Sequence, residues 1–496
     1  MFFDTIATIN KAVNDFVWGV PAMVCIIGVG LLLSVRTGFL QIRKFPFALK
    51  TTIGRMFHKK EASDGAMTPF QAVCTALAGT VGTGNIVGTS QAIALGGYGA
   101  VFWLWLAALL GMMIKYSEVT LSIQYRERDA KGDWVGGPMY YVKNGLSKHW
   151  QWVGILFCVF AAIASFGIGN MGQINKIVLN MKSAFFGGVT ATVGGMSVVS
   201  LACGIVLMIL AALIVIGGLQ RIATVAERVV PFMAVLYIIG SLIVFFTHIS
   251  SVGAMFAAIF RFAFGSKAVA GGAAGIAIQQ AITQGCKRGV FSNEAGLGSS
   301  VMVHSSSNVK EPVAQGMWGI FEVFFDTFVV CTMTAIVVLS SGYIDLETGF
   351  AVAGVDDATL VARAFGNVFG PLGEKFVALA MLLFAFTTVL GWSQYGTKAV
   401  EYLFGEKATK IYKVIFVVMI LSGAVMTSSL AWDISDTFNG LMMLPNLIGV
   451  VVLCPMVMKI TKNYVNRKIK GIPEEPVLSH FPDIQAEAAA SQTDEV

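Results

Sequence analysis

The amino-acid sequence predicts an all-α polytopic membrane protein of about eleven transmembrane helices, in which one N-terminal span precedes a 5+5 inverted repeat. Hydrophobic residues make up 56% of the 496 residues and charged residues only 12%, a composition that excludes water-soluble globular proteins. Apolar segments long enough to cross a bilayer recur along the chain, and two of them are interrupted by glycines at matching positions. Together these observations predict the fold class.

The spans follow one another closely. Segment 36–69, after the first span, carries seven Lys and Arg residues against two acidic ones, which places it in the cytoplasm. The N-terminus is then outside and the C-terminus cytoplasmic, and the other basic clusters also fall inside. Taking roughly 20 apolar residues per crossing, we expect spans near residues 16–35, 70–95, 100–123, 151–179, 197–217, 229–248, 268–285, 313–341, 372–396, 411–431 and 437–460.

Four regions follow from this count. The second to sixth spans form one group of five and the seventh to eleventh another, and because five is odd the second group enters the membrane with opposite orientation. The tail beyond about Gly471 has no apolar run and is predicted to be disordered. The regions are 1–69, the N-terminal span and basic linker; 70–248, the first repeat; 249–465, the second repeat; and 466–496, the cytoplasmic tail.

Each repeat opens on an interrupted segment, Leu77–Gly88 in the first and Gln284–Gly298 in the second. Non-helical backbone at membrane depth is tolerated only where it is buried in protein or lines a cavity, so the pair predicts a transport site. A new helix beginning near Gly84 and Asn85 would direct N–H groups at an anion, and carbonyls before the break could hold a cation. Two other interpretations of these glycines are a helix-packing GxxxG face at Gly84 and Gly88 and, with little support, a nucleotide loop.

Five runs of residues resemble one known family. TALAGTVGTGNIVG (75–88), GGPMYY (136–141), FGIGN (166–170), KRGVFSNEAGLGS (287–299) and TTVLGWSQYG (387–396) are similar, in order and spacing, to the alanine or glycine:cation symporter family. The resemblance implies a leucine-transporter-type core that moves small neutral amino acids with sodium. It also implies that the backbone N–H groups of Thr83, Gly84 and Asn85 meet the substrate carboxylate, while Ala78 and Val81 offer carbonyls to sodium.

Thr387 and Thr388 are adjacent hydroxyl residues inside an apolar span. Each hydroxyl could simply bond the carbonyl four residues earlier in its own helix. Sodium, a hard cation, needs several oxygen ligands, and the resemblance favours a sodium site formed by Thr387, Thr388, Ala78 and Val81.

Further polar residues at membrane depth are candidate substrate ligands. Asn170 and Gln173 lie three residues apart on one helix face, and Thr283 and Gln284 precede the second break. A buried amide is costly without a partner, and a zwitterionic ligand supplies partners. Bonds to neighbouring helices are the alternative. Trp392 either walls the substrate pocket or is ordinary packing.

Carboxylates inside a span are functional candidates. Glu322 and Asp326 lie four residues apart, so one of them is expected to be protonated or paired with a basic residue near Lys287 and Arg288. A structural ion pair and a second cation or proton site both remain open. Lys115 and Glu118 are expected to lie near the cytoplasmic end of their span as anchors.

The predicted function is sodium-driven uptake of alanine or glycine by alternating access. The partners are then the amino acid, sodium and the lipid bilayer, with no nucleic acid and no organic cofactor. No catalytic set can be assembled, and the seven scattered cysteines show no metal-binding spacing, so an enzyme is not expected. The alternatives are a proton-coupled carrier using Asp326, a carrier of a larger amino acid such as glutamine, and, less favoured, a channel or receptor.

Overall fold

The computed structural model describes residues 2–55, 66–265, 273–352, 359–426 and 430–493. Over these residues the chain is almost entirely helical, with two short antiparallel hairpins, β1–β2 and β3–β4. The expected spans at 268–285 and 411–431 fall partly outside the described residues, at 268–272 and 427–429.

The elements have the following bounds. The α-helices are α1 (Phe2–Val17), α2 (Val20–Arg36), α3 (Leu40–Arg43), α4 (Phe45–Thr52), α5 (Pro69–Thr80), α6 (Thr89–Gly96), α7 (Gly99–Gln124), α8 (Pro138–Gly145), α9 (Gln151–Phe166), α10 (Gly172–Phe185), α11 (Val198–Val215), α12 (Gly218–Thr247), α13 (Ile249–Ala263), α14 (Ala273–Asn293), α15 (Val301–His304), α16 (Pro312–Val323), α17 (Thr332–Ser340), α18 (Leu360–Phe369), α19 (Pro371–Phe404), α20 (Glu406–Val425), α21 (Leu430–Val452), α22 (Cys454–Tyr464) and α23 (Pro482–Thr493). Short 3-10 helices cover Ile53–Arg55 and Lys148–Trp150, and π-helical segments cover Gly84–Gly88, Gly167–Met171, Phe324–Cys331 and Val465–Ile469. The strands are β1 (Glu127–Arg128), β2 (Trp134–Val135), β3 (Thr192–Val193) and β4 (Met196–Ser197).

Most of the predicted spans are continuous helices. In the described part of the chain, 8 helices are long and apolar enough to cross a membrane, or 9 when α21 and the bent α22 count as one span. Two expected spans are not among them. Segment 70–95 is broken between α5 and α6, and α14 carries Gln279, Gln280 and Gln284 along its length. The two expected spans that are not simple apolar helices are thus the two that the sequence marks as interrupted.

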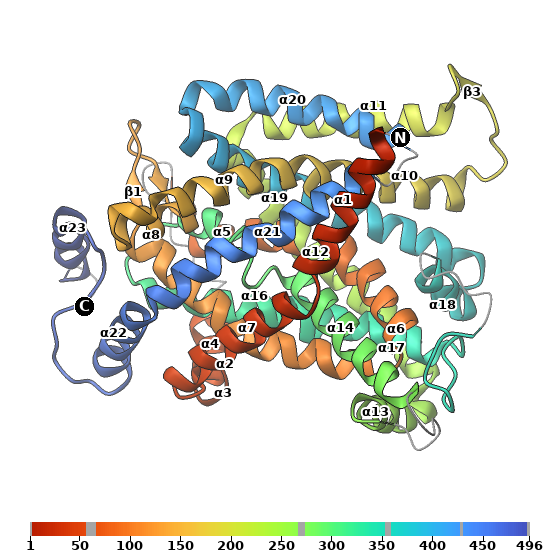
Figure 1. The fold of residues 1–496 in the computed structure, drawn as a ribbon, viewed down its shortest axis with the longest axis horizontal. Helices are drawn as coiled ribbons and strands as arrows, with labels where there is room; N and C mark the ends of the chain where they lie inside the picture. Colours follow the sequence, from red (N-terminus) through yellow and green to blue (C-terminus); the bar gives the residue numbers. More distant parts are fainter. Residues whose placement is uncertain (1, 56–65, 266–272, 353–358, 427–429, 494–496) are drawn as a thin grey trace.

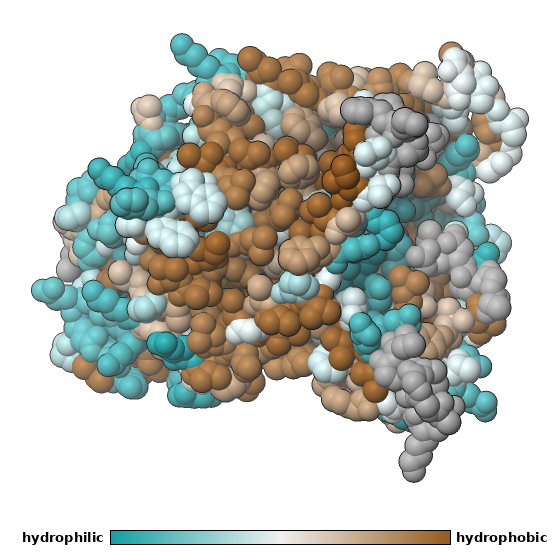
Figure 2. Space-filling model, viewed as in Figure 1, coloured by the Kyte–Doolittle hydropathy of each residue, from teal (hydrophilic) through white to brown (hydrophobic). Residues whose placement is uncertain are grey.

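Apolar side chains cover the outside of the bundle. Ile209 and Leu213 on α11, Phe232 on α12 and Ile411 on α20 all belong to a large set of exposed hydrophobic residues. Figure 2 shows apolar residues over the middle of the molecule and hydrophilic residues gathered at its left end. An apolar surface of this extent is expected where lipid covers a protein.

The long helices run between two ends of the molecule. β1, α22, α23 and the C-terminus lie at the left end of Figure 1, while β3 and α18 lie at the right end, and α9 and α20 extend lengthwise between them. We call the left end, which carries the β1–β2 hairpin and the C-terminal segment, the tail end.

The first helix break lies where the glycines predict it. α5 begins with a capping box, in which Thr68 and Gln71 exchange side-chain and backbone hydrogen bonds of 3.1 Å, and it ends at Thr80. Val81 is extended, and helix resumes at Gly84. The side-chain oxygen of Asn85 accepts the N–H of Gly82 at 2.9 Å, so the break is satisfied from within the chain. The prediction of a new helix near Gly84 and Asn85 is confirmed.

The second break is confined to the last part of the segment predicted for it. α14 continues through Lys287 and Arg288 to Asn293, and α15 begins at Val301. The intervening residues include three with positive φ, namely Glu294 (52°), Gly296 (95°) and Gly298 (76°). A left-handed backbone ends a helix, and two of these three positions hold glycine, which adopts it without strain.

Close approach of glycines brings the first break against α19. A Cβ on Gly391 of α19 would lie 2.6 Å from the Cα of Gly79 in α5, so the two backbones pack directly together there. At Gly169 a Cβ would lie 2.4 Å from Trp392. The break in α5, the π-helical segment Gly167–Met171 and the middle of α19 therefore surround one small region.

The predicted disorder of the tail beyond Gly471 is wrong for residues 471–493. The N–H of His480 donates to the carbonyl of Gln124 at 2.9 Å, Leu478 is buried, and Glu487 pairs with Arg128 at 2.7 Å. The sequence lacks an apolar run there because the segment docks mainly through backbone and side-chain hydrogen bonds.

We expect the docked tail to slow amide hydrogen exchange. The N–H groups of Leu478 and Ser479 both donate to Oε1 of Gln485, at 2.7 and 2.9 Å. Gln485→Ala removes this acceptor and should speed exchange of both amides by about fivefold, since a hydrogen bond contributes roughly 1 kcal/mol. Asp483→Asn on the same helix is the control and should leave both rates unchanged. Equal, fast exchange of these amides in the unaltered protein would show that the tail is undocked in solution.

Candidate functional site

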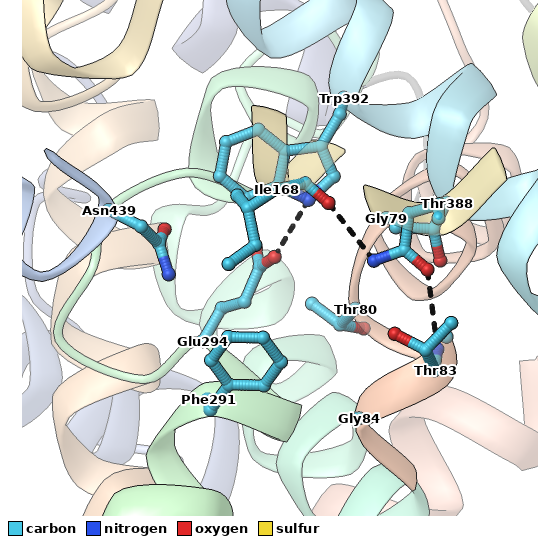
Figure 3. Close-up of a pocket in the computed structure, with 12 residues that line it drawn as sticks. Gly79, Thr80, Thr83, Gly84, Ile168, Phe291, Glu294, Thr388, Trp392 and Asn439 are labelled. Carbon is cyan, nitrogen blue, oxygen red and sulfur yellow. Dashed lines mark hydrogen bonds between the residues drawn. The ribbon is translucent and has the colours of Figure 1, made fainter. Parts of the chain in front are cut away.

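A cavity lies between the two helix breaks, deep in the bundle. Its empty volume is about 290 Å³. Figure 3 shows Thr80, Thr83 and Gly84 on one side and Glu294 and Phe291 on the other, with Trp392 and Ile168 above. The lining residues are Gly79, Thr80, Gly82, Thr83, Gly84, Ile168, Gln173, Phe291, Glu294, Thr388, Trp392 and Asn439.

Five of the predicted site residues line this cavity: Thr83, Gly84, Gln173, Thr388 and Trp392. They come from the first break, from α10 and from α19, segments that are up to about three hundred residues apart in the chain. Ala78 and Val81, whose carbonyls are predicted to bind sodium, flank lining residues of the same break. A Cβ on Gly391 would lie 3.3 Å from the carbonyl carbon of Ala78.

Three predicted residues point their polar atoms elsewhere. The backbone N–H of Asn85, predicted to bind the substrate carboxylate, donates to the carbonyl of Gly82 at 3.3 Å, and Asn85 does not line the cavity. The amide nitrogen of Asn170 donates to the carbonyl of Phe416 at 2.6 Å. The Thr387 hydroxyl donates within its own helix, to the carbonyls of Leu383 at 3.0 Å and Phe384 at 2.9 Å, and neither Asn170 nor Thr387 lines the cavity. Thr388 also donates to Phe384, yet a Cβ on Gly82 would lie 2.3 Å from its oxygen, so its hydroxyl lies at the first break.

The structure does not bring Thr283 and Gln284 to the cavity either. Both precede the break by about three helical turns. Gln284 packs beside Gly96 of α6, because a Cβ built on Gly96 would lie 3.1 Å from the Cβ of Gln284. They were candidates because the second interruption was expected to begin at residue 284, whereas the helix continues for nine more residues, to Asn293.

Glu294 and Asn439 line the cavity and were missed by the sequence analysis. Glu294 accepts the indole N–H of Trp392 at 3.0 Å and the hydroxyl of Ser299. Asn439 is buried, and its Oδ1 is among the buried side-chain atoms of the described residues that have no hydrogen-bond partner. A signal was present for each, because a carboxylate beside a glycine break and an asparagine inside an apolar span are both costly at membrane depth without a role.

Gln173 connects the first break to the π-helical segment Gly167–Met171. Its Oε1 accepts the N–H of Thr83 over a long 3.4 Å, and its Nε2 donates to the carbonyl of Ile168 at 3.0 Å. Its side chain thus faces the break with an acceptor and bonds the Thr83 N–H there.

A buried ionic network binds the backbone and side chains of the second break. Nζ of Lys115 on α7 donates to the carbonyl of Glu294 at 3.1 Å and to Ser300 at 2.7 Å, and it lies 3.6 Å from a carboxylate oxygen of Glu322. His304 contacts the other Glu322 oxygen at 2.9 Å. The prediction of Lys115 as an interfacial anchor is therefore wrong.

Glu118 is also buried rather than interfacial. Its Oε1 accepts the N–H of Gly296 at 3.1 Å and the amide of Asn446 at 2.5 Å. Lys115 and Glu118 both extend into the second break. Polar groups of the folded chain bind their charged ends there, in place of water at the membrane surface.

Asp326 joins the two broken helices. One carboxylate oxygen accepts the amide of Asn85 at 2.6 Å, and the other accepts the hydroxyls of Ser292 and Thr327, both at 2.9 Å. The sequence predicted that one of the two carboxylates would pair with a basic residue near Lys287 and Arg288. This prediction is wrong for Glu322, whose partners are Lys115 and His304.

A polar cavity enclosed by two interrupted helices in a bundle of membrane-spanning helices is the arrangement of a secondary transporter. The chain matches the model of the sodium:alanine symporter family over residues 3–479, and it belongs to that family. It is thus a multi-pass membrane transporter that couples amino-acid transport to sodium, and it is not an enzyme.

Two relatives and one solved structure illustrate the similarity. The sodium/alanine symporter AgcS of Methanococcus maripaludis is 40% identical over 463 residues, covering 93% of this chain and 97% of that protein. The probable sodium/glutamine symporter GlnT of Bacillus subtilis is 36% identical over 468 residues, covering 94% of this chain and 91% of that protein. The structure of MhsT in complex with L-phenylalanine superposes with a TM-score of 0.52 at 15% identity, over 82% of this chain and 99% of that one, and confirms the predicted fold class.

Proposed function

We propose that this protein takes up a small neutral amino acid, alanine or glycine, together with sodium, and that the cavity between the breaks is the substrate site. The observation that carries the proposal is the opposed lining of this cavity. Thr83 and Gly84 line it at the start of a helix, where backbone N–H groups are free to bind an anion, and Asn439, with its unpartnered oxygen, and Glu294 line its other side.

A zwitterion matches this lining at both ends. Its carboxylate is bound by the N–H groups of the break, where the helix dipole also favours negative charge. Its ammonium group is bound by the acceptors of Asn439 and Glu294. The rings of Trp392 and Phe291 both line the cavity and narrow it, which favours a short side chain.

Sodium is proposed to bind at the C-terminal end of α5. The carbonyls of Ala78 and Val81 belong to a helix end whose last carbonyls have no intrahelical partner, and the Thr388 hydroxyl lies against Gly82. These oxygens suit a hard cation. The Thr387 hydroxyl donates to carbonyls of its own helix and is not a sodium ligand in this proposal.

Transport by alternating access fits two broken helices that face a common cavity. In this proposal the regions 70–248 and 249–465 are the two inverted repeats. The basic linker 36–69 and the C-terminus lie on the cytoplasmic side, so the tail end, which carries the C-terminal segment, faces the cytoplasm.

The function is tested by uptake of radiolabelled alanine into proteoliposomes, with and without an inward sodium gradient. We expect saturable uptake that the sodium gradient drives and that unlabelled glycine inhibits. Inhibition by glutamine alone would favour the larger-substrate alternative, which the name of GlnT also suggests. Uptake driven by a proton gradient without sodium would favour the proton-coupled alternative through Asp326.

Adjacent threonines provide a matched test of the sodium site. Thr388→Ala removes the hydroxyl at the first break and should raise the sodium concentration for half-maximal uptake by about tenfold or more, since one lost ligand bond costs roughly 1.5–3 kcal/mol with a charged partner. Thr387→Ala removes a hydroxyl bonded within α19 and should change it less than about twofold. Equal effects of the two variants would remove Thr388 from the ion site.

A further inference from the structure

A second cavity lies at the tail end of the molecule. Its empty volume is about 1050 Å³, and its walls come from the β1–β2 turn, the start of α12, the last turns of α19 and the first turns of α20. We call it the vestibule. Gln394 in its wall follows Trp392 in the wall of the first cavity by two residues, an axial rise of about 3 Å along α19. The two cavities therefore lie at nearly the same height along α19, on different faces of this helix.

Tyr395 closes α19 against α5 beside the two cavities. Its hydroxyl donates to the carbonyl of Ala76 at 3.3 Å, and a Cβ on Gly79 would lie 2.1 Å from the hydroxyl oxygen. The two cavities share no lining residue, so the vestibule is a separate space in this structure.

The vestibule contains a buried hydrogen-bond donor without a partner. Gln394 is 2% exposed, and its Nε2 is among the buried side-chain atoms of the described residues that make no hydrogen bond. A buried N–H group left unsatisfied is destabilising, so a group that enters the vestibule and accepts this bond is favoured. One turn further on, the Thr397 hydroxyl donates to Ser393 at 2.6 Å and keeps its acceptor capacity for the cavity.

Charges of both signs line the vestibule in equal number. The basic residues are Lys131, Lys398 and Lys413, and the acidic residues are Asp129, Asp133 and Glu401. Lys398 pairs with Glu401 at 3.0 Å, and Lys131 pairs with Glu406, which holds the hairpin turn over the cavity. A lining with no net charge gives no preference to a free cation or anion, whereas a dipolar ligand gains from both signs.

We propose that the vestibule is a second binding station for the amino-acid zwitterion, in which Gln394 and Lys413 bind the carboxylate and Glu401 and Thr397 bind the ammonium group. This inference rests on the proposed function. Substrate leaving the central cavity toward the tail end occupies the station before it reaches solution, so the station sets the affinity on that side of the membrane.

The test compares substrate affinity on the two sides of the membrane. Gln394→Leu keeps the length of the side chain and removes the unpartnered donor. In inside-out vesicles we expect the alanine concentration for half-maximal transport to rise about fivefold or more, from loss of one hydrogen bond. In right-side-out vesicles it should change less than about twofold, and the sodium dependence should be unaltered. Ser393→Ala, next on the same helix with its hydroxyl bonded to Leu390, is the matched control and should behave as the unaltered protein.

Equal shifts on both sides, or no shift on either, would overturn the proposal. Lys413→Met provides a second variant at the half-buried rim in case Gln394→Leu does not reach the membrane, and it should give the same one-sided shift. Equilibrium dialysis of alanine with the purified protein is an independent measurement, because it should detect two bound molecules per chain, one of which binds about fivefold more weakly in either variant. Absence of sodium-driven alanine uptake by the unaltered protein would instead reject the proposed function.

Discussion

Replacing Gly84 by leucine is expected to abolish saturable amino-acid uptake while the protein still reaches the membrane. A Cβ at this position would already lie 3.3 Å from the Phe291 ring and from the Cα of Ser292 in α14. The rest of a leucine side chain would fill the space between the breaks where the substrate carboxylate is proposed to bind. The gain in helix propensity is only about 1 kcal/mol, so the loss comes from steric exclusion. Uptake of labelled alanine and surface expression of the same cells measure the two effects.

Gly88→Leu is the matched control for this prediction. Gly88 belongs to the same π-helical segment, but the nearest atom to its Cβ is Cδ of the flexible Arg288 side chain, 3.9 Å away. Uptake should therefore be retained within about threefold, as expected for a position without a steric conflict. Near-normal alanine uptake by Gly84→Leu would remove the substrate from the first break.

Replacing Lys115 by methionine is expected to destabilise the protein by about 3–5 kcal/mol, the usual cost of breaking a buried ion pair by removing one partner. Lys115 and Glu322 are fully buried, and Lys115 also binds the second break through the Glu294 carbonyl. Thermal unfolding of the purified protein in detergent measures the loss.

Two further variants separate charge from packing. Lys143→Met removes the same type of residue from a partly exposed pair with Glu127 and should cost at most about 1 kcal/mol. The double variant Lys115→Met/Glu322→Gln removes both buried charges and should be more stable than Lys115→Met alone. Similar losses for Lys115→Met and Lys143→Met would show that the buried pair has no special role.

The position of the first break could be predicted because its cause is local. Glycines 79, 82 and 84 weaken the helix, and the capping side chain of Asn85 lies three residues from the N–H that it accepts. The second break was located only approximately, because the residues before it are compatible with helix and the positive φ of Glu294 depends on contacts with distant segments.

The buried charges and the tail could not be predicted in the same way. Lys115 and Glu118 bind atoms of residues 294–300 and Asn446, all far away in the sequence, and from the sequence alone both resembled surface anchors. Likewise, Leu478 and His480 dock through contacts with α7 and within the tail itself, and composition carries no signal of such contacts. Asn439 was missed because a single amide in an apolar span has no local pattern around it.

Three of the four π-helical segments in the described part of the chain lie around the cavity between the helix breaks. Gly84 and Ile168 line it, and Asp326 in Phe324–Cys331 bonds Asn85 beside it. A π turn accommodates one residue more than an α turn. If that residue passes to the adjoining helix, everything beyond it rotates by about 100° and advances by about 1.5 Å, while the helix stays continuous. Two of these register steps thus lie in the cavity wall and the third lies beside it. Each can re-aim a side chain by exchanging a few hydrogen bonds rather than by unfolding a span.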